Sequence, residues 1–352
     1  MIFHSAAMGR VMACAGSYML QQGKPNPSRI EATEGTDAHR YAAGILLGTS
    51  ALESIPSPEM QTAVGRYVDV CQAMQCGGVE VKHDMEDGDN ELRGTPDFYS
   101  WGFDNILRVA DLKYGYGWVE AEENWQLLCY AVLIWIAAGG YMPVGVEIII
   151  VQPRANHPGG PVRKWYFAGE LIRNYYNQIR GAMAAAAIPG AVTHAGEHCR
   201  YCRAIVDCHT NRDSVYNCID VAGRATESEL AGDELAYELG LISSAQRLIT
   251  QRAVALEAYA TERIKTGHPV PGYEVRSGMG SLSWDVPDPI AAGIEFDVDL
   301  AAPAVAVTPT QAIARKIITQ EQAGWMASRK AKAPSLRKVN LKLAKELIKN
   351  AG

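Results

Sequence analysis

The sequence lacks three features that would place a chain in a class at once. No apolar run reaches the roughly 18 residues that a membrane-spanning helix needs; the longest candidate covers only residues 131–138. The first residues show no charged start followed by a long apolar stretch, so we expect no signal peptide and no membrane contact. An excess of positive charge is also missing, because the formal net charge is −6. These absences favour a cytoplasmic protein and argue at first against a nucleic-acid partner.

The composition is that of a globular chain with a substantial core. Hydrophobic residues make up 48% and charged residues 20%, which excludes a disordered chain and a collagen-like fibre. The length of 352 residues fits one large domain or two ordinary ones. The eight cysteines, in a reducing compartment, are better explained as metal ligands or buried thiols than as disulfides. Glycine motifs that bind phosphates at strand-to-helix turns are missing, which argues against a doubly wound nucleotide fold.

Charge is unevenly distributed along the chain. Residues 309–352, the basic tail, have a net charge of +8, so the remaining residues have a net charge of −14. The tail is either a solvated helical surface or an arm that contacts phosphates, and we expect helices over 309–323 and 335–350. The net charge of the whole chain therefore says little about its partners.

The hydrophobic pattern predicts a mixed α/β chain, with three strands forming a meander between helices. The predicted helices cover 5–22, 31–47, 60–74, 122–138, 169–187 and 227–266. The predicted strands cover 79–85, 92–100, 106–113, 144–151 and 163–167. The strand over 144–151 is apolar on both faces, which is typical of a central strand. Residues 285–310 are rich in Pro, Ala and Asp, and we expect a linker there.

Two aspartates and a lysine lie within the predicted meander. Asp97 follows a turn signal, and Asp111 and Lys113 are two residues apart on an otherwise apolar strand, so their side chains share one face. In a hairpin Asp97 would approach Asp111, and converging carboxylates repel each other unless a cation lies between them. Mg²⁺ or Mn²⁺ prefers such oxygen ligands, and an ammonium group beside the ion can orient an attacking water. We favour this hypothesis over solvated turn residues.

Three closely spaced cysteines predict a second site. Cys199, Cys202 and Cys208 occur as C-x2-C-x5-C, a spacing typical of metal ligands. A fourth ligand is needed: either a nearby histidine, which would complete a tetrahedral zinc site, or a distant cysteine such as Cys14. The candidate histidines are His194, His198 and His209. The other four cysteines lack paired spacing, and we expect them to be buried thiols.

These motifs together resemble the PD-(D/E)XK nuclease superfamily, in particular its RecB-like branch. "GTPD" at 94–97 and "DLK" at 111–113 resemble the core motif. His39, in "EGTDAH", resembles the histidine that this branch adds as a metal ligand, and Gln126 and Tyr130 resemble its QxxxY motif. Glu80 is similar to a further carboxylate of the site. The resemblance extends over residues 5–210 and is greatest to a phage and prophage group.

The resemblance implies a fold and roles for these residues. The fold would be a restriction-endonuclease-like core, a mixed sheet flanked by helices, with helical additions at both ends. The nuclease core would cover 1–215, and a helical or extended region with the basic tail would cover 216–352. His39, Glu80, Asp97 and Asp111 would bind Mg²⁺ or Mn²⁺, Lys113 would position the attacking water, and Gln126 and Tyr130 would orient DNA or support Lys113. The implied DNA contacts are Lys113, Tyr130, Arg329 and Lys330.

The cysteines resemble those of nucleases of the AddB and CRISPR-adaptation type. In those proteins one cysteine precedes the core and a C-x2-C-x5-C cluster follows it. The resemblance implies that Cys14, Cys199, Cys202 and Cys208 bind a [4Fe–4S] cluster, with zinc as the alternative. Such a site would tie together the two ends of the nuclease core.

The implied activity is that of a metal-dependent DNA exonuclease, in preference to an endonuclease. It would act in phage recombination or DNA end processing, in the host cytoplasm if phage-encoded, and could pass its product to a single-strand annealing protein. The alternative is a catalytically degenerate phage protein that binds DNA or another partner and has a structural zinc or iron–sulfur site. The sequence leaves the polarity of digestion, the strand preference and the oligomeric state open.

Overall fold

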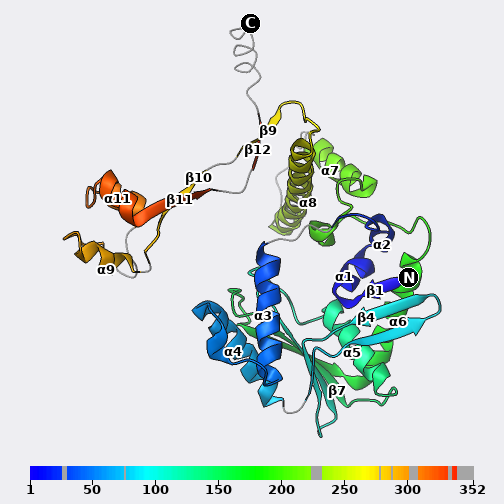
Figure 1. Ribbon diagram of the computed structural model, residues 1–352. Helices are drawn as coiled ribbons and strands as arrows, with labels where there is room; N and C mark the ends of the chain where they lie inside the picture. Colours follow the sequence, from blue (N-terminus) through cyan, green and yellow to red (C-terminus); the bar gives the residue numbers. More distant parts are fainter. Residues whose placement is uncertain are drawn as a thin grey trace. The chain divides into compact units, whose positions relative to one another are not determined.

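Figure 1 shows the computed structural model of the chain. It describes residues 1–25, 30–74, 77–222, 232–276, 279–286, 288–300, 308–331 and 335–338. The chain divides into two compact units, Met1–Arg252 and Ala253–Gly352, which are treated separately below. No helix in these described ranges combines the length and the apolar character that crossing a membrane requires.

The first unit alternates helices and strands. Its helices are α1 (Ser5–Ala13), α2 (Ser17–Leu20), α3 (Ile30–Leu46), α4 (Pro58–Ala73), α5 (Trp125–Ala137), α6 (Ile172–Ala186) and α7 (His209–Ala222), with the start of α8 (Gly232–Lys265). Short 3-10 helices are η1 (Leu52–Ser54), η2 (Gly169–Leu171) and η3 (Glu197–Tyr201). The strands are β1 (Ile2–His4), β2 (Gly78–Val79), β3 (His83–Asp87), β4 (Asn90–Gly94), β5 (Phe98–Trp101), β6 (Ile106–Leu112), β7 (Gly145–Val151) and β8 (Val162–Ala168).

A mixed five-stranded sheet forms the centre of this unit, in the order β2-β5-β6-β7-β8. β6 and β7 are parallel, and the other neighbours are antiparallel. The parallel pair is joined through α5, because parallel neighbours need a crossover connection. β7 is buried along nearly its whole length, which confirms the prediction of a strand covered on both faces.

Alternate residues of the central strands belong to two separate cores. Leu107 and Val109 of β6 pack with residues of α1, α5 and α6, whereas Ala110 and Leu112 pack with residues of α3 and α4. This is the period-two alternation expected of a strand between two helical layers, and Figure 1 shows α3 and α4 together beside the sheet. The predicted fold class, a mixed sheet flanked by helices with helical additions, is thereby confirmed.

The predicted meander is wrong in one respect, because it divides between two sheets. β3 and β4 form a hairpin that pairs with β1 in a separate three-stranded sheet of order β1-β4-β3. The chain leaves this sheet at Pro96, which has no N–H group to continue a strand ladder, and joins the central sheet at β5. Gly94 lies at the end of β4, where a Cβ atom would come within 2.9 Å of the Tyr130 ring. This close approach brings β4 against α5, the helix that carries Gln126 and Tyr130.

The second unit contains the end of α8, the strands β9 (Tyr273–Arg276), β10 (Met279–Trp284), β11 (Ala327–Ala331) and β12 (Ser335–Lys338), and the helices α9 (Pro289–Ile294), α10 (Pro309–Ala314) and α11 (Gln320–Met326). β10 pairs with β11, and β12 with β9.

The predicted linker over residues 285–310 contains α9. The predicted helix over 309–323 is two helices, because Lys316 between them has a positive φ of 56°. The predicted helix over 335–350 begins in strand β12, and residues 339–352 lie outside the described part of the chain.

The division between the units lies later than the predicted boundary at residue 215. Arg252 in α8 donates hydrogen bonds to Ile205 O at 2.9 Å and to Asn211 Oδ1 at 3.2 Å. These bonds tie the first part of α8 to the cysteine-containing segment. The extent of the nuclease core as a domain stays a prediction.

Candidate active site

Two antiparallel strands bring the predicted aspartates to one edge of the central sheet. β5 and β6 pair with Phe98 opposite Ala110, so Asp97 before β5 comes opposite Asp111 near the end of β6. Lys113 directly follows β6, and its N–H donates to Val151 O at 2.9 Å. Strand ends of this kind present polar side chains at the rim of an apolar sheet.

His39, Glu80 and Asp97 form the tightest group of candidate metal ligands. One ligand atom from each lies within 4.8 Å of the others. His39 comes from α3, Glu80 follows β2, and Asp97 precedes β5. Glu80 has a φ of 50°, a left-handed conformation that residues other than glycine rarely adopt. Strained backbone of this kind often occurs where function requires a particular side-chain direction.

Two hydrogen bonds fix the Asp97 carboxylate. Its Oδ2 atom accepts the Leu112 backbone N–H at 2.8 Å and lies 3.1 Å from His39 Nδ1. Burial lowers the pKa of His39, but the neighbouring Asp97 raises it more, so the net pKa is raised. The carboxylate of Asp97 thus favours the charged form of His39, and that charge would offset part of the carboxylate charge.

A second polar group adjoins the first and consists of Asp111, Lys113, Gln126 and Tyr130. Lys113 Nζ lies 2.8 Å from Asp111 Oδ2 and donates to Gln126 Oε1 at 2.9 Å. Gln126 Nε2 donates to Tyr130 OH at 2.8 Å and to Asp111 Oδ1 at 3.3 Å. The two residues four apart on α5 therefore share one face, as the spacing predicts. The geometry brings together the predicted residues, whose roles stay predictions.

Electrostatics distinguish the members of this group. Burial raises the pKa of Asp111 to about 6, with Lys113 lowering it and Asp97 raising it. Burial lowers the pKa of Lys113, but Asp111 and Asp97 raise it, and the net pKa is raised. Burial and the nearby Asp97 also raise the pKa of Glu80. The pKa values of Asp111 and Glu80 are thus both raised by burial and by nearby negative charge, which is the condition that a bound cation relieves.

The residues present fit a hard divalent cation. Glu80 and Asp97 offer oxygen atoms and His39 a nitrogen atom at one point, and Asp111 lies beside them as a buried, fully shielded carboxylate. Mg²⁺ and Mn²⁺ favour such ligands and retain water or phosphate oxygens in their other positions. Asp111 is not part of the group of three, and Lys113 and Gln126 contact its two oxygens.

A buried glutamine fixes the loop that follows Lys113, and the sequence analysis missed it. Gln152 is fully buried, and its Nε2 donates to Gly115 O at 2.9 Å and to Gly117 O at 2.7 Å. Its Oε1 accepts from Val119 N at 3.1 Å and from Arg163 Nη2 at 2.6 Å. A polar residue directly after the apolar run of β7 was the signal that could have identified it.

The four predicted cluster cysteines form one contiguous group. His194 N donates to Cys14 Sγ at 3.4 Å, and His198 contacts both Cys14 and Cys199. Cys202 interacts electrostatically with Cys199 and Cys208. Burial raises the pKa of Cys14 and of Cys199, but hydrogen bonds, first that of His198, lower it more, and the net pKa of each is lowered. The shifts of Cys14 and Cys199 are toward the thiolate form that binds metals, whereas burial raises the pKa of Cys202.

Further contacts join the two segments that carry these cysteines. Gly16 N donates to Val192 O at 2.9 Å, and Arg203 N donates to Gln21 Oε1 at 3.2 Å. Arg10 donates to Tyr201 O at 2.8 Å and is in electrostatic contact with Cys202, Cys14 and Cys199. A guanidinium group beside three thiols offsets the negative charge that they would carry as ligands.

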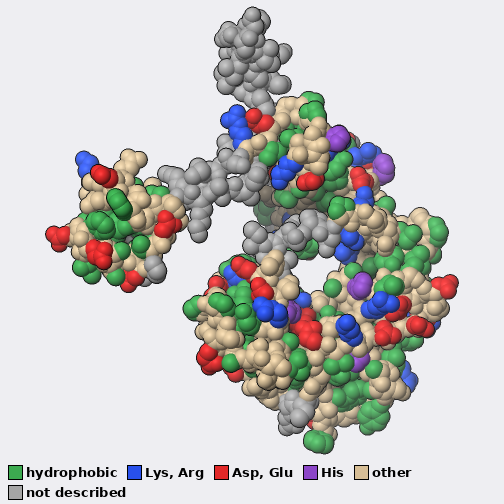
Figure 2. All heavy atoms as spheres, viewed as in Figure 1, with side chains coloured by type: hydrophobic (Ala, Val, Ile, Leu, Met, Phe, Trp, Pro, Cys, Tyr) green, Lys and Arg blue, Asp and Glu red, His purple; other side chains and the backbone are tan. Residues whose placement is uncertain are grey.

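Of the predicted DNA contacts in the basic tail, the structure describes the backbone but not the side chains. Arg329 and Lys330 lie in β11 of the second unit, and their side chains lie outside the described part of the chain. On the visible face of the first unit, basic and acidic side chains are intermixed (Figure 2). A contact with phosphates on that face would therefore depend on local groups and not on a broad basic surface.

Comparisons with known proteins give a family, and several solved structures are distantly similar. The family model described as "Protein of unknown function (DUF2800)" matches residues 3–297. The crystal structure of SSO0001 is 10% identical, with 59% of this chain and 86% of that chain covered and a TM-score of 0.32. A protein described as "Putative exonuclease" from Eubacterium rectale is 8% identical, with 65% and 91% covered and a TM-score of 0.34.

Proposed function

We propose that this chain, which belongs to the family described as "Protein of unknown function (DUF2800)", is a metal-dependent deoxyribonuclease. The single observation that supports this most is the pair of adjoining groups at one sheet edge. His39, Glu80 and Asp97 offer ligand atoms within 4.8 Å of one another, and the Asp111–Lys113 pair lies beside them. The order and spacing of these residues are those of the PD-(D/E)XK nucleases of the RecB-like branch, as the resemblance implied.

The chain's own residues have distinct roles in this proposal. His39, Glu80, Asp97 and Asp111 would hold Mg²⁺ or Mn²⁺, which as a Lewis acid lowers the pKa of a water and stabilises charge on a phosphate. Lys113 Nζ, fixed between Asp111 and Gln126, orients the attacking water and donates a hydrogen bond to the reacting phosphate. Gln126 fixes Lys113, and Tyr130 OH fixes Gln126 at 2.8 Å.

We further propose that the enzyme acts on DNA ends as an exonuclease, in phage recombination or end processing. A single-strand annealing protein is the proposed partner that takes the product. The basic tail, with Arg329 and Lys330, is a proposed second contact with DNA phosphates. A cytoplasmic location, in the host cell if the protein is phage-encoded, belongs to the same proposal.

A [4Fe–4S] cluster bound by Cys14, Cys199, Cys202 and Cys208 is proposed as a structural element. The contacts that join Cys14 to the segment carrying the other three thiols support one shared site, and Arg10 would offset its negative charge. Iron content and absorbance near 400 nm distinguish it from zinc.

The alternative, a degenerate protein that only binds DNA or a partner, predicts no such arrangement of acid and lysine. Asp111 is fully buried and Lys113 is partly buried, and such an ion pair is expensive to maintain without a function. The complete set of polar contacts from Asp97 to Tyr130 therefore favours an active site over a relic.

The decisive experiment compares Asp111→Asn and Lys113→Gln with wild-type protein on linear DNA labelled at either end. Each variant should digest DNA on the order of 10²–10⁴-fold more slowly in Mg²⁺ or Mn²⁺. Lys164→Gln, an exposed position on β8, is the matched control and should digest normally. Closed circular DNA should resist digestion if ends are required. Wild-type rates in either site variant would refute the assignment.

A further inference from the structure

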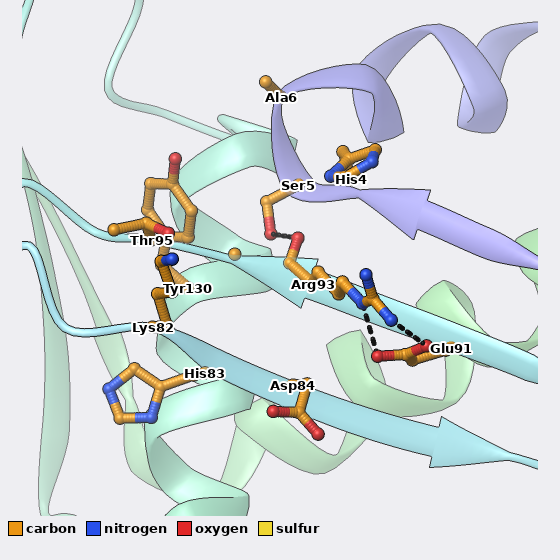
Figure 3. Close-up of a pocket in the computed structure, with 11 residues that line it drawn as sticks. His4, Ser5, Ala6, Lys82, His83, Asp84, Glu91, Arg93, Thr95 and Tyr130 are labelled. Carbon is orange, nitrogen blue, oxygen red and sulfur yellow. Dashed lines mark hydrogen bonds and ion pairs between the residues drawn. The ribbon is translucent and has the colours of Figure 1, made fainter.

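The two ends of α1 lie beside polar groups that differ in how fully they are satisfied. Ser5 and Ala6 at its start line a cavity of about 610 Å³ beside Tyr130, between α1, β3, β4 and α5 (Figure 3). Ser5 Oγ donates there to Arg93 O at 3.1 Å, and Arg93 Nη2 donates to Glu91 Oε2 at 2.8 Å. These groups engage one another, as the dashed lines in Figure 3 mark, and they are satisfied without a ligand.

At the other end of α1, beside the predicted cluster cysteines, a buried amide lacks an acceptor. Asn211 lies in the first turn of α7, three residues after Cys208, and its side chain is fully buried. Its Nδ2 atom has no hydrogen-bond partner among the residues that the structure describes. An amide N–H that is buried without an acceptor is costly and therefore rare, so this group indicates an acceptor that binds beside it.

Arg252 of α8 fixes the direction of this amide. Its side chain is buried, and its Nη1 atom donates to Asn211 Oδ1 at 3.2 Å and to Ile205 O at 2.9 Å. A guanidinium group can only donate hydrogen bonds, so the amide must turn its oxygen toward Arg252 and its Nδ2 atom away from it. The orientation of the unpartnered donor is therefore determined by the protein itself.

The Asn211 amide faces the sulfur atom of Cys199. Burial raises the pKa of that thiol, and His198 and then Asn211 are among the groups whose hydrogen bonding lowers it. A neutral thiol is only a weak acceptor, which leaves the Nδ2 donor unsatisfied. A thiolate accepts more strongly, and thiolate is the form in which cysteine binds a metal.

A second unpartnered donor lies on the segment that carries Cys14. Ser17 is buried, its backbone N–H donates to Cys14 O at 3.0 Å, and within the described ranges its Oγ atom has no partner. Two buried donors from distant segments of the chain thus lie beside the same group of thiols. Both are suited to sulfur atoms that carry negative charge, as metal-bound sulfur atoms do.

We propose that Asn211 is a positioning residue of the cysteine site, whose Nδ2–H group donates to the sulfur atom of Cys199 when that sulfur binds metal, and that Arg252 sets its direction. The proposal rests on the proposed cluster and extends it, because it makes α8 part of the surroundings of the site. Hydrogen bonds to the sulfur atoms help to set the reduction potential of a cluster. The same bond would stabilise a thiolate bound to zinc.

Two substitutions of Asn211 distinguish a donor from a residue that only packs α7 against α8. Asn211→Asp keeps the shape of the side chain and its bond with Arg252, but it replaces the N–H donor with an acceptor. Asn211→Leu removes the donor without adding charge. Asn217→Asp, at an exposed position on the same helix, is the matched control. Melting temperatures verify that all three variants are folded.

The release of metal to a chelator provides a readout that is independent of nuclease activity. In protein purified without oxygen, both Asn211 variants should lose iron roughly tenfold faster than wild type, and Asn217→Asp should lose it at the wild-type rate. The reduction potential should be lower in both Asn211 variants, because the donor no longer stabilises the added electron. If the metal is zinc, the release of zinc replaces that of iron. Wild-type release from Asn211→Leu, or a change in Asn211→Asp alone, would overturn the proposal.

The outcomes separate this proposal from those before it. Metal binding with unchanged release from both Asn211 variants would overturn the role of Asn211 and leave the cysteine site intact. A wild type that binds neither iron nor zinc would overturn the cysteine site and the role of Asn211 together. DNA digestion that depends on Asp111 and Lys113 is measured at the other site, so the nuclease proposal stands or falls separately.

Discussion

Replacing Gln152 with leucine should loosen the loop that follows Lys113. The side chain is fully buried at the end of β7 and makes four hydrogen bonds, three with the loop backbone at Gly115, Gly117 and Val119 and one with Arg163. Leucine has a similar volume but no polar atom, so it would leave all four partners without their bonds.

The expected loss of stability follows from these four bonds. At about 1 kcal/mol of net stabilisation for each, the variant should lose about 4 kcal/mol of unfolding free energy. For a unit of some 250 residues, about 2–4 °C of melting temperature per kcal/mol gives a decrease of roughly 8–16 °C. Lys113 begins this loop, so the DNA-digesting activity should also fall at temperatures where the protein is still folded.

Urea unfolding and thermal melting measure the first effect, and DNA digestion measures the second. The matched control is Gln178→Leu, an exposed glutamine on α6, which should change the unfolding free energy by less than about 0.5 kcal/mol. If Gln152→Leu unfolds within about 1 kcal/mol of wild type, the network does not fix the loop, and the reasoning is refuted.

Three further predictions concern the proposed metal sites. Glu80→Gln should raise the Mn²⁺ concentration for half-maximal digestion about tenfold or more, because it removes one ligand charge; Asp84→Asn, nearby but outside the ligand group, should not. Burial raises the pKa of Asp111 to about 6, so proton binding stabilises the folded, metal-free protein below about pH 4, and this contribution disappears as the pH rises through 6. Wild type should thus lose about 3 kcal/mol relative to Asp111→Asn between pH 4 and pH 8 in chelator, measured by urea unfolding, and equal slopes would contradict this. Cys14→Ala should abolish iron binding and the absorbance near 400 nm, whereas Cys218→Ala should leave both unchanged.

Much of the fold could be predicted because apolar periodicity is a local signal. The strand over 144–151 and the helix over 122–138 were recognisable from composition alone, and both occur as β7 and α5. The meander could not be resolved into two sheets, because the change of sheet at Pro96 depends on the pairing of β4 with β1. That partner lies about ninety residues away in the chain, and no local pattern specifies it.

Of the candidate site, too, only part could be predicted from the sequence. Asp111 and Lys113 share a strand, and Gln126 and Tyr130 share a helix face, so spacing was sufficient to relate the members of each pair. The approach of His39 and Glu80 to Asp97 depends on how α3 and β2 pack, and only the resemblance suggested it. Gln152 and the cavity beside Tyr130 have no sequence motif, because they arise where separate elements end together.

The short helix α1 gives the molecule a mechanical connection between two regions. Its first turn lines the cavity at Ser5 and Ala6, and Cys14 directly follows its last turn. Nine residues at about 1.5 Å each form a rod of roughly 14 Å, too short to bend appreciably. A metal or cluster bound at the thiol end of this rod, as proposed, would therefore also fix its opposite end, and loss of that group should loosen the first turn of α1 without touching the carboxylates.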